Sequence, residues 1–200
     1  MADLFDEKSK DWDMNNIVRE LSSAIGSSII KHLPLHSEMD VMDFGAGTGL
    51  ISSHIVPHVK KITAVDISES MLAELVSKSE LKGKVEALCQ DIILTPIQKQ
   101  FDLIMSAMAL HHVEHTDKLI QRFSEHLKSG AMIALADLDR EDGSFHPIDT
   151  KGVFHLGFER NSFKMILEKH GFQEISFITA HTVIKQEIEY PIFLVIATKS

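Results

Sequence analysis

The sequence predicts an α/β fold: a mostly parallel sheet of seven strands, with helices on both faces and a C-terminal antiparallel hairpin. Three observations support this. Short apolar runs alternate with helical patterns through most of the chain, which is typical of a parallel sheet. The runs are apolar nearly throughout, as in strands covered on both faces. Two strand-like runs then end the chain with no helix between them, which predicts a hairpin.

The composition indicates one ordinary globular domain. The chain has 200 residues, of which 44% are hydrophobic and 24% charged, a mixture that can bury a core. We therefore treat residues 1–200 as a single domain. The formal net charge of −9 argues against nucleic acid as a partner, because binding to a phosphate backbone relies on clustered lysine and arginine.

Other broad features limit the cellular setting. No segment approaches the roughly 20 apolar residues of a membrane helix, so no membrane partner is expected. The residues Met1–Asp13 lack the apolar run of a secretory signal, and a cytoplasmic location is the resulting expectation. The single cysteine, Cys89, excludes an internal disulfide and a cysteine-based zinc site of the usual kind. It lies inside an expected strand, so we expect it to be buried in the core.

The elements of the first half follow from apolar spacing and helix-ending residues. Apolar residues four apart predict a long amphipathic first helix, which Pro34 ends. Ser68 is suited to cap a later helix, and Gly83 to end that unit. The expected elements are a helix over Met14–His32, a strand over Asp40–Phe44, a helix from Leu50 to about His58, a strand over Lys61–Ile67, a helix after Ser68 and a strand over Val85–Cys89.

The second half is read in the same way. A basic last turn and a glycine, Lys128–Gly130, are expected to end a helix, and Gly171 another. Five strand–helix steps are expected before the hairpin. The expected elements are a strand over Phe101–Ala107, a helix over Thr116–Leu127, a strand over Ala131–Leu138, a helix over Arg160–His170, and hairpin strands over Glu174–Ile184 and Glu189–Thr198.

The most informative segment joins the first strand to the next helix, over Val41–Gly49. An apolar strand ends, three glycines alternate with single residues, and a helix opens. Glycine lets a ligand approach the backbone where a Cβ would clash, and a helix start offers unpaired N–H groups. Asp43 lies just before the turn, where its carboxylate can bond backbone amides or a cationic group of a ligand.

The glycine spacing distinguishes between two kinds of cofactor. Dinucleotide-binding turns follow G-x-G-x-x-G, whereas positions 45–49 read Gly-Ala-Gly-Thr-Gly after Asp43. This pattern, Asp-x-Gly-x-Gly-x-Gly, resembles motif I of the class I S-adenosylmethionine-dependent methyltransferases, whose fold is Rossmann-like. An incidental glycine turn is the alternative. The resemblance implies that the methionine end of S-adenosylmethionine is held by Asp43, Gly45, Ala46, Gly47 and Gly49.

Two acids follow the next strands. Asp66 ends the second strand, where a carboxylate can accept both hydroxyls of a ribose, and Ile67 beside it offers an apolar wall for a purine. Asp91 follows the third strand, and the resemblance implies that it bonds the adenine amino group. For either acid alone, a helix cap or a solvated loop is the alternative. The remaining cofactor-binding residues implied by the resemblance are Met71, Ile92, Ala107 and Trp12.

Two further segments resemble the family. The fourth strand continues from Ser106 into Leu110-His111-His112, which is similar to the S-x-x-x-L-H-H ending of small-molecule methyltransferases. Phe5 and Trp12 lie in a segment that is similar to one folding over the cofactor in many relatives, although an ordinary amphipathic start is equally consistent. We therefore expect residues 1–35 to form an N-terminal helical cap, and residues 140–160 to form a loop on the acceptor side.

The function implied by the resemblance is transfer of a methyl group from S-adenosylmethionine to a small-molecule acceptor by in-line displacement. Such a reaction needs alignment of the nucleophile, and a base only when the nucleophile arrives protonated. The alternative is a cofactor-binding regulatory or adaptor subunit without activity. A nicotinamide-dependent oxidoreductase is a third reading, which the glycine spacing and the hairpin oppose.

Catalytic residues are harder to identify. His111 and His146 are the candidates for a base near the acceptor, with packing or a solvated loop as the alternatives. The neighbouring histidines His111, His112 and His115 would rarely face one ion from a loop, and Asp137 and Asp139 are weak indications of a metal. No metal is therefore expected.

Overall fold

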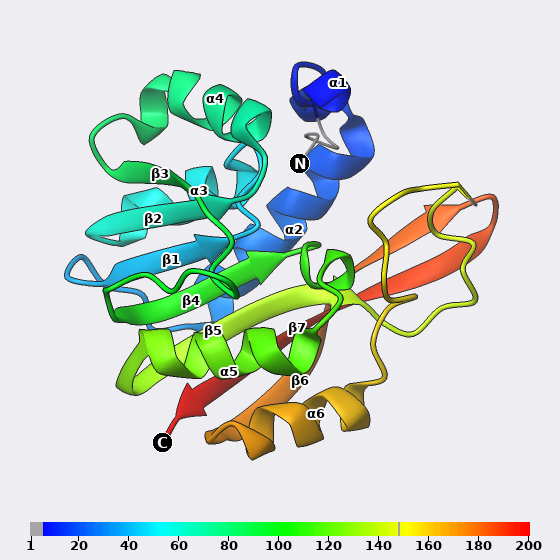
Figure 1. The fold of residues 1–200 in the computed structure, drawn as a ribbon. Coiled ribbons are helices and arrows are strands. Elements are labelled where there is room, and N and C mark those ends of the chain that lie inside the picture. The colour runs from blue at the N-terminus through cyan, green and yellow to red at the C-terminus, as the bar shows by residue number, and fades with distance from the viewer. Residues whose placement is uncertain (1–5, 148) are drawn as a thin grey trace.

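The structure is a computed structural model that describes residues 6–147 and 149–200, with only the backbone at positions 7 and 8. It consists of one seven-stranded sheet with helices on both faces (Figure 1). The strands are β1 (Asp40–Phe44), β2 (Lys61–Asp66), β3 (Val85–Cys89), β4 (Phe101–Ala107), β5 (Leu127–Leu138), β6 (Phe172–Lys185) and β7 (Ile188–Lys199).

The strand order is β3-β2-β1-β4-β5-β7-β6. Strands β1 to β5 pair in parallel, and β7 lies antiparallel between β5 and β6. The predicted fold class is therefore confirmed, hairpin included. Two residues with positive φ, Gln186 (49°) and Glu187 (66°), form the hairpin turn, and this two-residue geometry matches the twist of the paired strands.

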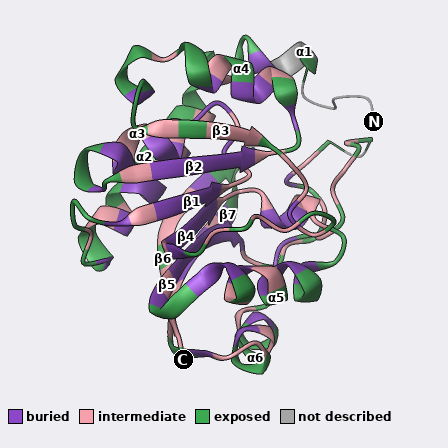
Figure 2. Cartoon of the chain, turned by 60° about the vertical axis from the view of Figure 1, so that its left-hand side comes forward, coloured by how far each residue is buried: buried purple, intermediate pink, exposed green. Residues whose placement is uncertain are grey.

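The helices form two layers. The helical segments are α1 (Asp6–Ser9), η1 (Trp12–Met14), α2 (Asn16–His32), α3 (Leu50–Ile55), η2 (Val56–His58), α4 (Glu69–Ser77), η3 (Ser79–Leu81), η4 (Leu110–His112), α5 (Thr116–His126) and α6 (Arg160–Lys169). One apolar cluster packs α2, α3 and α4 on one face of the sheet, and a second packs α5 and α6 on the other. The central strands are accordingly buried (Figure 2).

The helix predicted over Thr116–Leu127 ends one residue earlier, and the strand predicted from Ala131 begins four residues earlier, so the basic last turn and glycine stop expected at Lys128–Gly130 are wrong. Helix α5 ends at His126, and β5 already begins at Leu127, which pairs with Phe101. Residues Lys128–Gly130 thus belong to the strand. Their basic and glycine signals describe a local helix stop, but these residues lie in the irregularity of the β4–β5 register, between the pairs Phe101–Leu127 and Leu103–Met132.

One of the five expected strand–helix steps has no helix. The connection from β3 to β4, residues 90–100, is irregular throughout. Its apolar residues Ile92, Ile93 and Ile97 pack into the cluster beneath α5, so they cover the sheet face that a helix would otherwise cover. Pro96 lies within this segment and cannot donate a helical hydrogen bond.

Several boundaries differ slightly from prediction. Helix α2 begins at Asn16 rather than Met14, because the side chain of Asn15 caps it by accepting from the N–H groups of Ile17 and Val18. The expected cap at Ser68 is confirmed, since its Oγ accepts from the N–H of Met71 at 3.2 Å.

Cys89 is exposed rather than buried. It ends β3, which lies at the edge of the sheet, and the residues of this strand alternate between half-buried and exposed positions. A strand in the middle of the sheet would have buried it. None of the helices in the described part of the chain has the length and apolar content to span a lipid bilayer.

Candidate functional site

The carboxyl ends of the parallel strands meet at one edge of the sheet. Neighbouring strands end in register, as Phe44 of β1 does beside Ser106 of β4. The strand order reverses between β1 and β4, and open α/β sheets bind ligands in the crevice at such a reversal. The expected site residues at or just beyond these strand ends are Asp43, Gly45, Gly47, Asp66, Asp91 and Ala107.

Hydrogen bonds fold the glycine turn over the end of β2. The N–H of Gly45 donates to the carbonyl oxygen of Val65 at 2.8 Å. The N–H of Gly47 donates to a carboxylate oxygen of Asp66, also at 2.8 Å. The turn and the second acid of the predicted motif are therefore directly joined, although 19 residues separate them.

The three glycines have positive φ for different reasons. A Cβ on Gly45 would lie 2.3 Å from the Cβ of Ala109, and one on Gly49 would lie 2.8 Å from Cγ of Leu75. These two glycines therefore allow close packing of the chain on itself. A Cβ on Gly47 would meet nothing within 4 Å, so the backbone there faces open space that a ligand can enter.

Asp43 is buried behind the turn, with an exposed fraction of 2%. Its carboxylate accepts from the hydroxyl of Ser52 on α3 at 2.7 Å. Burial, together with the nearby Asp66 carboxylate, raises the pKa of Asp43 to about 7, against the hydrogen bond from Ser52, which lowers it. A cationic group beside Asp43 would stabilise its ionised form.

Asp66 and Ile67 form the next part of the edge. One carboxylate oxygen of Asp66 accepts from Gly47, and the other accepts from the N–H of Ser68 at 2.9 Å. Each carboxylate oxygen can accept more than one hydrogen bond. Ile67 follows with 69% of its side chain exposed, and an apolar side chain this exposed beside an acid offers a wall for a flat ring.

Asp91 begins the connection after β3. Its Oδ1 accepts from the N–H groups of Ile93 and Leu94, which fixes the turn and leaves Oδ2 without a hydrogen-bond partner in the described part of the chain. The side chain of Ile92 is fully buried in the core. Ile92, which was expected to bind the cofactor, can therefore contact a ligand only through its backbone.

Two other expected cofactor residues are also largely buried. Met71 on α4 is 3% exposed and Ala46 in the turn 9% exposed. Both side chains therefore pack beneath the site and form little of its surface. Ala107 ends β4 and is half-buried, and Met108 after it has a positive φ of 56° and donates its N–H to Ala136. This bend turns the chain across the edge of the sheet.

The N-terminal segment is tied to the glycine turn by Asp13. Its carboxylate accepts from the hydroxyl of Thr48 at 2.6 Å and pairs with Lys78 at the end of α4 at 2.5 Å. Trp12, which the sequence suggested for this site, precedes Asp13 and is half-buried. Phe5 lies outside the described residues. Asp13 was not predicted, because nothing in its own neighbourhood indicates a partner 35 residues away.

A buried pair lies beyond β4 and β5. Nδ1 of His111 lies 2.7 Å from Oδ1 of Asp137, and the two side chains are 1% and 0% exposed. The carboxylate also accepts from the N–H groups of Leu110, His111 and Leu138. Asp137 therefore anchors the turn that presents His111. One signal in the sequence points to it, a single acid inside an otherwise apolar strand.

His146 meets this pair from the loop after β5. Its Nε2 lies 3.2 Å from Nε2 of His111, across 35 residues of sequence. The two candidate base residues are thus in contact. Burial, together with nearby positive charge that includes the ammonium of Lys185, lowers the pKa of His146 to about 4.

The loop itself is held by several contacts. The hydroxyls of Ser144 and Tyr190 lie 2.7 Å apart, and the ammonium of Lys185 donates to the carbonyl of Phe145 at 2.9 Å and lies over its ring. At its base, Arg160 makes two hydrogen bonds to the carboxylate of Asp139. Sequence reasoning missed Tyr190 and Lys185, because they come from the distant hairpin.

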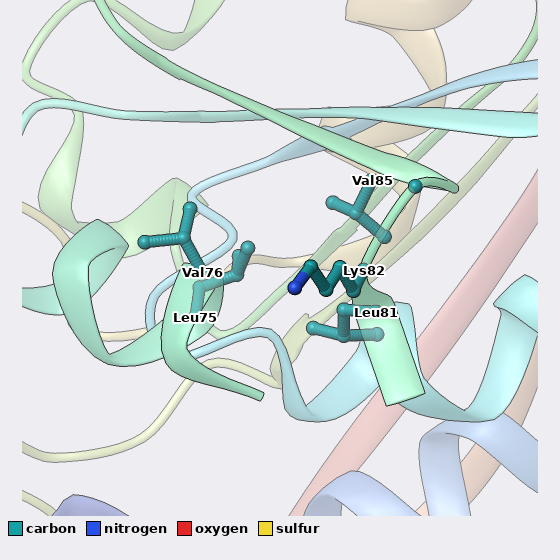
Figure 3. Close-up of a pocket in the computed structure, with 6 residues that line it drawn as sticks. Leu75, Val76, Leu81, Lys82 and Val85 are labelled. Atoms are coloured by element: carbon teal, nitrogen blue, oxygen red, sulfur yellow. The ribbon is translucent and has the colours of Figure 1, made fainter. Parts of the chain in front are cut away.

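Two other features lie apart from this edge. Within the described residues, no three histidine, cysteine, aspartate or glutamate side chains are placed to hold a metal ion. A cavity of about 190 Å³ lies between α4, η3 and the first residue of β3, lined by Leu75, Val76, Leu81, Lys82, Gly83 and Val85 (Figure 3). Because β3 begins there, this cavity is at the opposite end of the strand from the site.

Comparisons with known proteins agree with the sequence motif. The model of a family described as a methyltransferase domain matches residues 41–130. An uncharacterised methyltransferase of Schizosaccharomyces pombe is 31% identical over 137 residues, covering 60% of this chain and 48% of that protein. The ubiquinone biosynthesis O-methyltransferase of Coxiella burnetii is 31% identical over 102 residues, covering 50% and 44%. The chain thus spans about half the length of these relatives.

The fold is shared with solved structures. The N-methyltransferase NodS from Bradyrhizobium japonicum, in complex with S-adenosyl-L-homocysteine, superposes with a TM-score of 0.74 at 16% identity. The alignment covers 98% of this chain and 94% of that one. At this level of identity the likeness concerns the fold.

Proposed function

Because the chain belongs to the class I S-adenosylmethionine-dependent methyltransferases, we propose that it transfers the methyl group of this cofactor to a small-molecule acceptor. The observation that supports the proposal most is the direct bond between the open Gly47 backbone and Asp66. Small-molecule methyltransferases among the relatives, such as the ubiquinone biosynthesis enzyme, support the acceptor class.

The residues at the edge of the sheet fit the cofactor. The backbone at Gly47 is open, and the buried carboxyl of Asp43 beside it suits the cationic methionine end. Asp66 would hold the ribose hydroxyls and Ile67 would contact the purine. Oδ2 of Asp91 would accept from the adenine amino group. When bound, the cofactor supplies an electrophilic methyl group on a sulfonium.

The chain's own residues would then bind the cofactor, orient the acceptor and shield both from solvent. We assign residues 1–35 to a cap over the cofactor, an assignment supported by the contacts of Asp13 with Thr48 and Lys78. We assign residues 140–160 to the acceptor side, supported by the contact of His146 with His111. Alignment of the acceptor beside the cofactor would supply much of the rate increase.

Calorimetric titration with S-adenosylhomocysteine tests the donor half. Wild-type protein should bind it, and Asp66→Asn should bind it about 10–100-fold more weakly, because a lost bond to a charged partner costs roughly 1.5–3 kcal/mol. Asp117→Asn is the matched control, since Asp117 is an exposed acid that pairs with Lys169 and should leave the affinity unchanged. Absent binding to the wild type would refute the proposal.

A second experiment separates an enzyme from a cofactor-binding adaptor subunit. The purified chain is incubated with S-adenosylmethionine carrying a radiolabelled methyl group and a deproteinised extract of small molecules. We expect label to move into extract compounds without any other protein. Binding of S-adenosylhomocysteine without any such transfer would favour the adaptor role.

A further inference from the structure

We propose that Asp137, His111 and His146 form a proton relay that deprotonates an acceptor hydroxyl, with Nδ1 of His146 as the atom that receives the proton. This inference rests on the proposed methyl transfer and deepens it. It assigns the acceptor to molecules with an ionisable O–H group, such as a phenol or an enol.

The first link fixes the tautomer of His111. Its Nδ1 lies 2.7 Å from a carboxylate oxygen of Asp137, and an ionised carboxylate only accepts hydrogen bonds. Nδ1 of His111 therefore bears the hydrogen. The three backbone N–H groups that also donate to this carboxylate hold it in the orientation that the pair requires.

The second link fixes the tautomer of His146. A hydrogen bond between two nitrogens uses one hydrogen, and Nε2 of His111 and Nε2 of His146 are 3.2 Å apart. A neutral His111 that bears its hydrogen on Nδ1 can only accept at Nε2. His146 consequently donates from Nε2 and has its lone pair on Nδ1. That nitrogen has no hydrogen-bond partner within residues 6–147 and 149–200.

The surroundings keep His146 neutral. Burial, together with nearby positive charge such as the ammonium of Lys185, lowers its pKa to about 4, against the buried Asp137 carboxylate, which raises it. The lone pair is thus available at neutral pH, but such an imidazole alone is a weak base. The relay removes this weakness, because the transferred charge ends on His111 beside a carboxylate.

The proton balance is simple. The acceptor O–H gives its proton to Nδ1 of His146, and the Nε2 proton of His146 passes to Nε2 of His111. The electron pair left on the oxygen forms the new bond to the methyl carbon, while the pair of the broken carbon–sulfur bond goes to sulfur. After product release, the proton returns through His146 to solvent.

The charges favour a hydroxyl over an amine. A phenolic hydroxyl has a pKa of about 10, so it arrives protonated and gains from a base. An ammonium acceptor would bring a positive charge next to Lys185, whose Nζ lies over Phe145 beside His146. The same ammonium would stabilise a developing phenolate or enolate.

The tautomers can be measured without any acceptor. Nitrogen NMR of histidine-labelled protein saturated with S-adenosylhomocysteine should show His111 protonated on Nδ1 and His146 protonated on Nε2. In His111→Gln, His146 should return to a mixture of tautomers and its pKa should rise toward the ordinary value. A wild-type His146 protonated on Nδ1 would overturn the relay. Failure to bind S-adenosylhomocysteine would instead count against the proposed function.

Activity with two probe acceptors provides an independent measurement. Phenol arrives protonated at mildly alkaline pH, whereas 4-nitrophenol is largely ionised and bypasses the base. For His146→Gln we expect kcat with phenol to fall about 10²–10³-fold, with a much smaller fall for 4-nitrophenol and unchanged affinity for S-adenosylhomocysteine. His115→Gln, which changes an exposed histidine before α5, should behave as wild type.

Two results would contradict the inference. Equal losses with both phenols would mean that His146 only positions the loop. A wild type that binds S-adenosylhomocysteine but methylates an amine such as phenylethylamine and neither phenol would overturn the acceptor class. Because His146 is half-buried on a loop, its substitution should leave the fold intact.

Discussion

The donor side and the acceptor side of the candidate site are built from different chemical groups. On the donor side, the contacts come from backbone N–H groups and short acids within residues 43–91, and the open position is a glycine. On the acceptor side, they come from imidazole, hydroxyl and ammonium groups of η4, the loop after β5 and the hairpin. The difference follows from what each side must do.

A backbone-lined turn suits a cofactor that has the same shape in every turnover. Its N–H groups cannot be changed by substitution, and glycine only has to leave room for the ligand. Proton transfer instead needs side chains whose ionisation the surroundings can adjust. We infer that the acceptor side is also the part in which relatives with other acceptors would differ most, since loops tolerate change better than strand ends do.

The comparison predicts its largest effect on stability at the acceptor side. Asp137→Ala should destabilise the protein by about 3–5 kcal/mol, because it leaves the buried His111 and three backbone N–H groups without an acceptor. Urea unfolding followed by circular dichroism measures this. Asp142→Ala, in the exposed part of the loop that follows β5, should change stability by less than about 0.5 kcal/mol. Similar values for both variants would contradict the buried anchor.

On the donor side, two glycines should respond differently to the same substitution. Gly45→Ala should cost about 2–3 kcal/mol, because the new Cβ combines a positive φ with a 2.3 Å approach to Ala109. Gly47→Ala should cost only about 1 kcal/mol, since its Cβ meets nothing.

The two glycine substitutions should differ in the opposite order in their effect on cofactor binding. Gly47→Ala should weaken S-adenosylhomocysteine binding although it is the milder change for the fold, because its methyl group occupies the space left for the ligand. Thermal unfolding and calorimetry on both variants provide the measurement. Unchanged affinity in Gly47→Ala would mean that the cofactor does not approach the turn there.

Two opposed pH dependences of stability also distinguish the two sides. Asp43 has a raised pKa of about 7 in the folded state, so the folded protein binds more protons than the unfolded chain between about pH 4 and 7. Its contribution to stability therefore falls as pH rises through this window. His146 has a lowered pKa of about 4, so its contribution rises with pH between about 4 and 6.5.

Urea unfolding at about pH 5 and about pH 8 distinguishes the two sides. Asp43→Asn should become more stable relative to wild type at the higher pH, by about 2–3 kcal/mol. His146→Gln should become relatively more stable at the lower pH. Shifts of the same sign in both variants would contradict the environments described for these residues.

Much of the fold was predictable because its signals are local. The strands β1 to β4 and the Ser68 cap follow from runs of a few residues, and their expected places are confirmed. Where prediction failed, the deciding partner was distant. The pairing of Leu127 with Phe101 starts β5 before Lys128–Gly130, and the edge position of β3 exposes Cys89.

The sequence by itself predicted the proposed donor side of this protein. The spacing of Gly45, Gly47 and Gly49, with acids after the strands, is a short-range pattern that also indicates its ligand. Only the tertiary structure decided the acceptor side, because Asp137, His111 and His146 come from separate segments and no local pattern joins them. Contact between residues 26 and 35 positions apart depends on which strand ends are neighbours, and packing of the whole sheet sets that order.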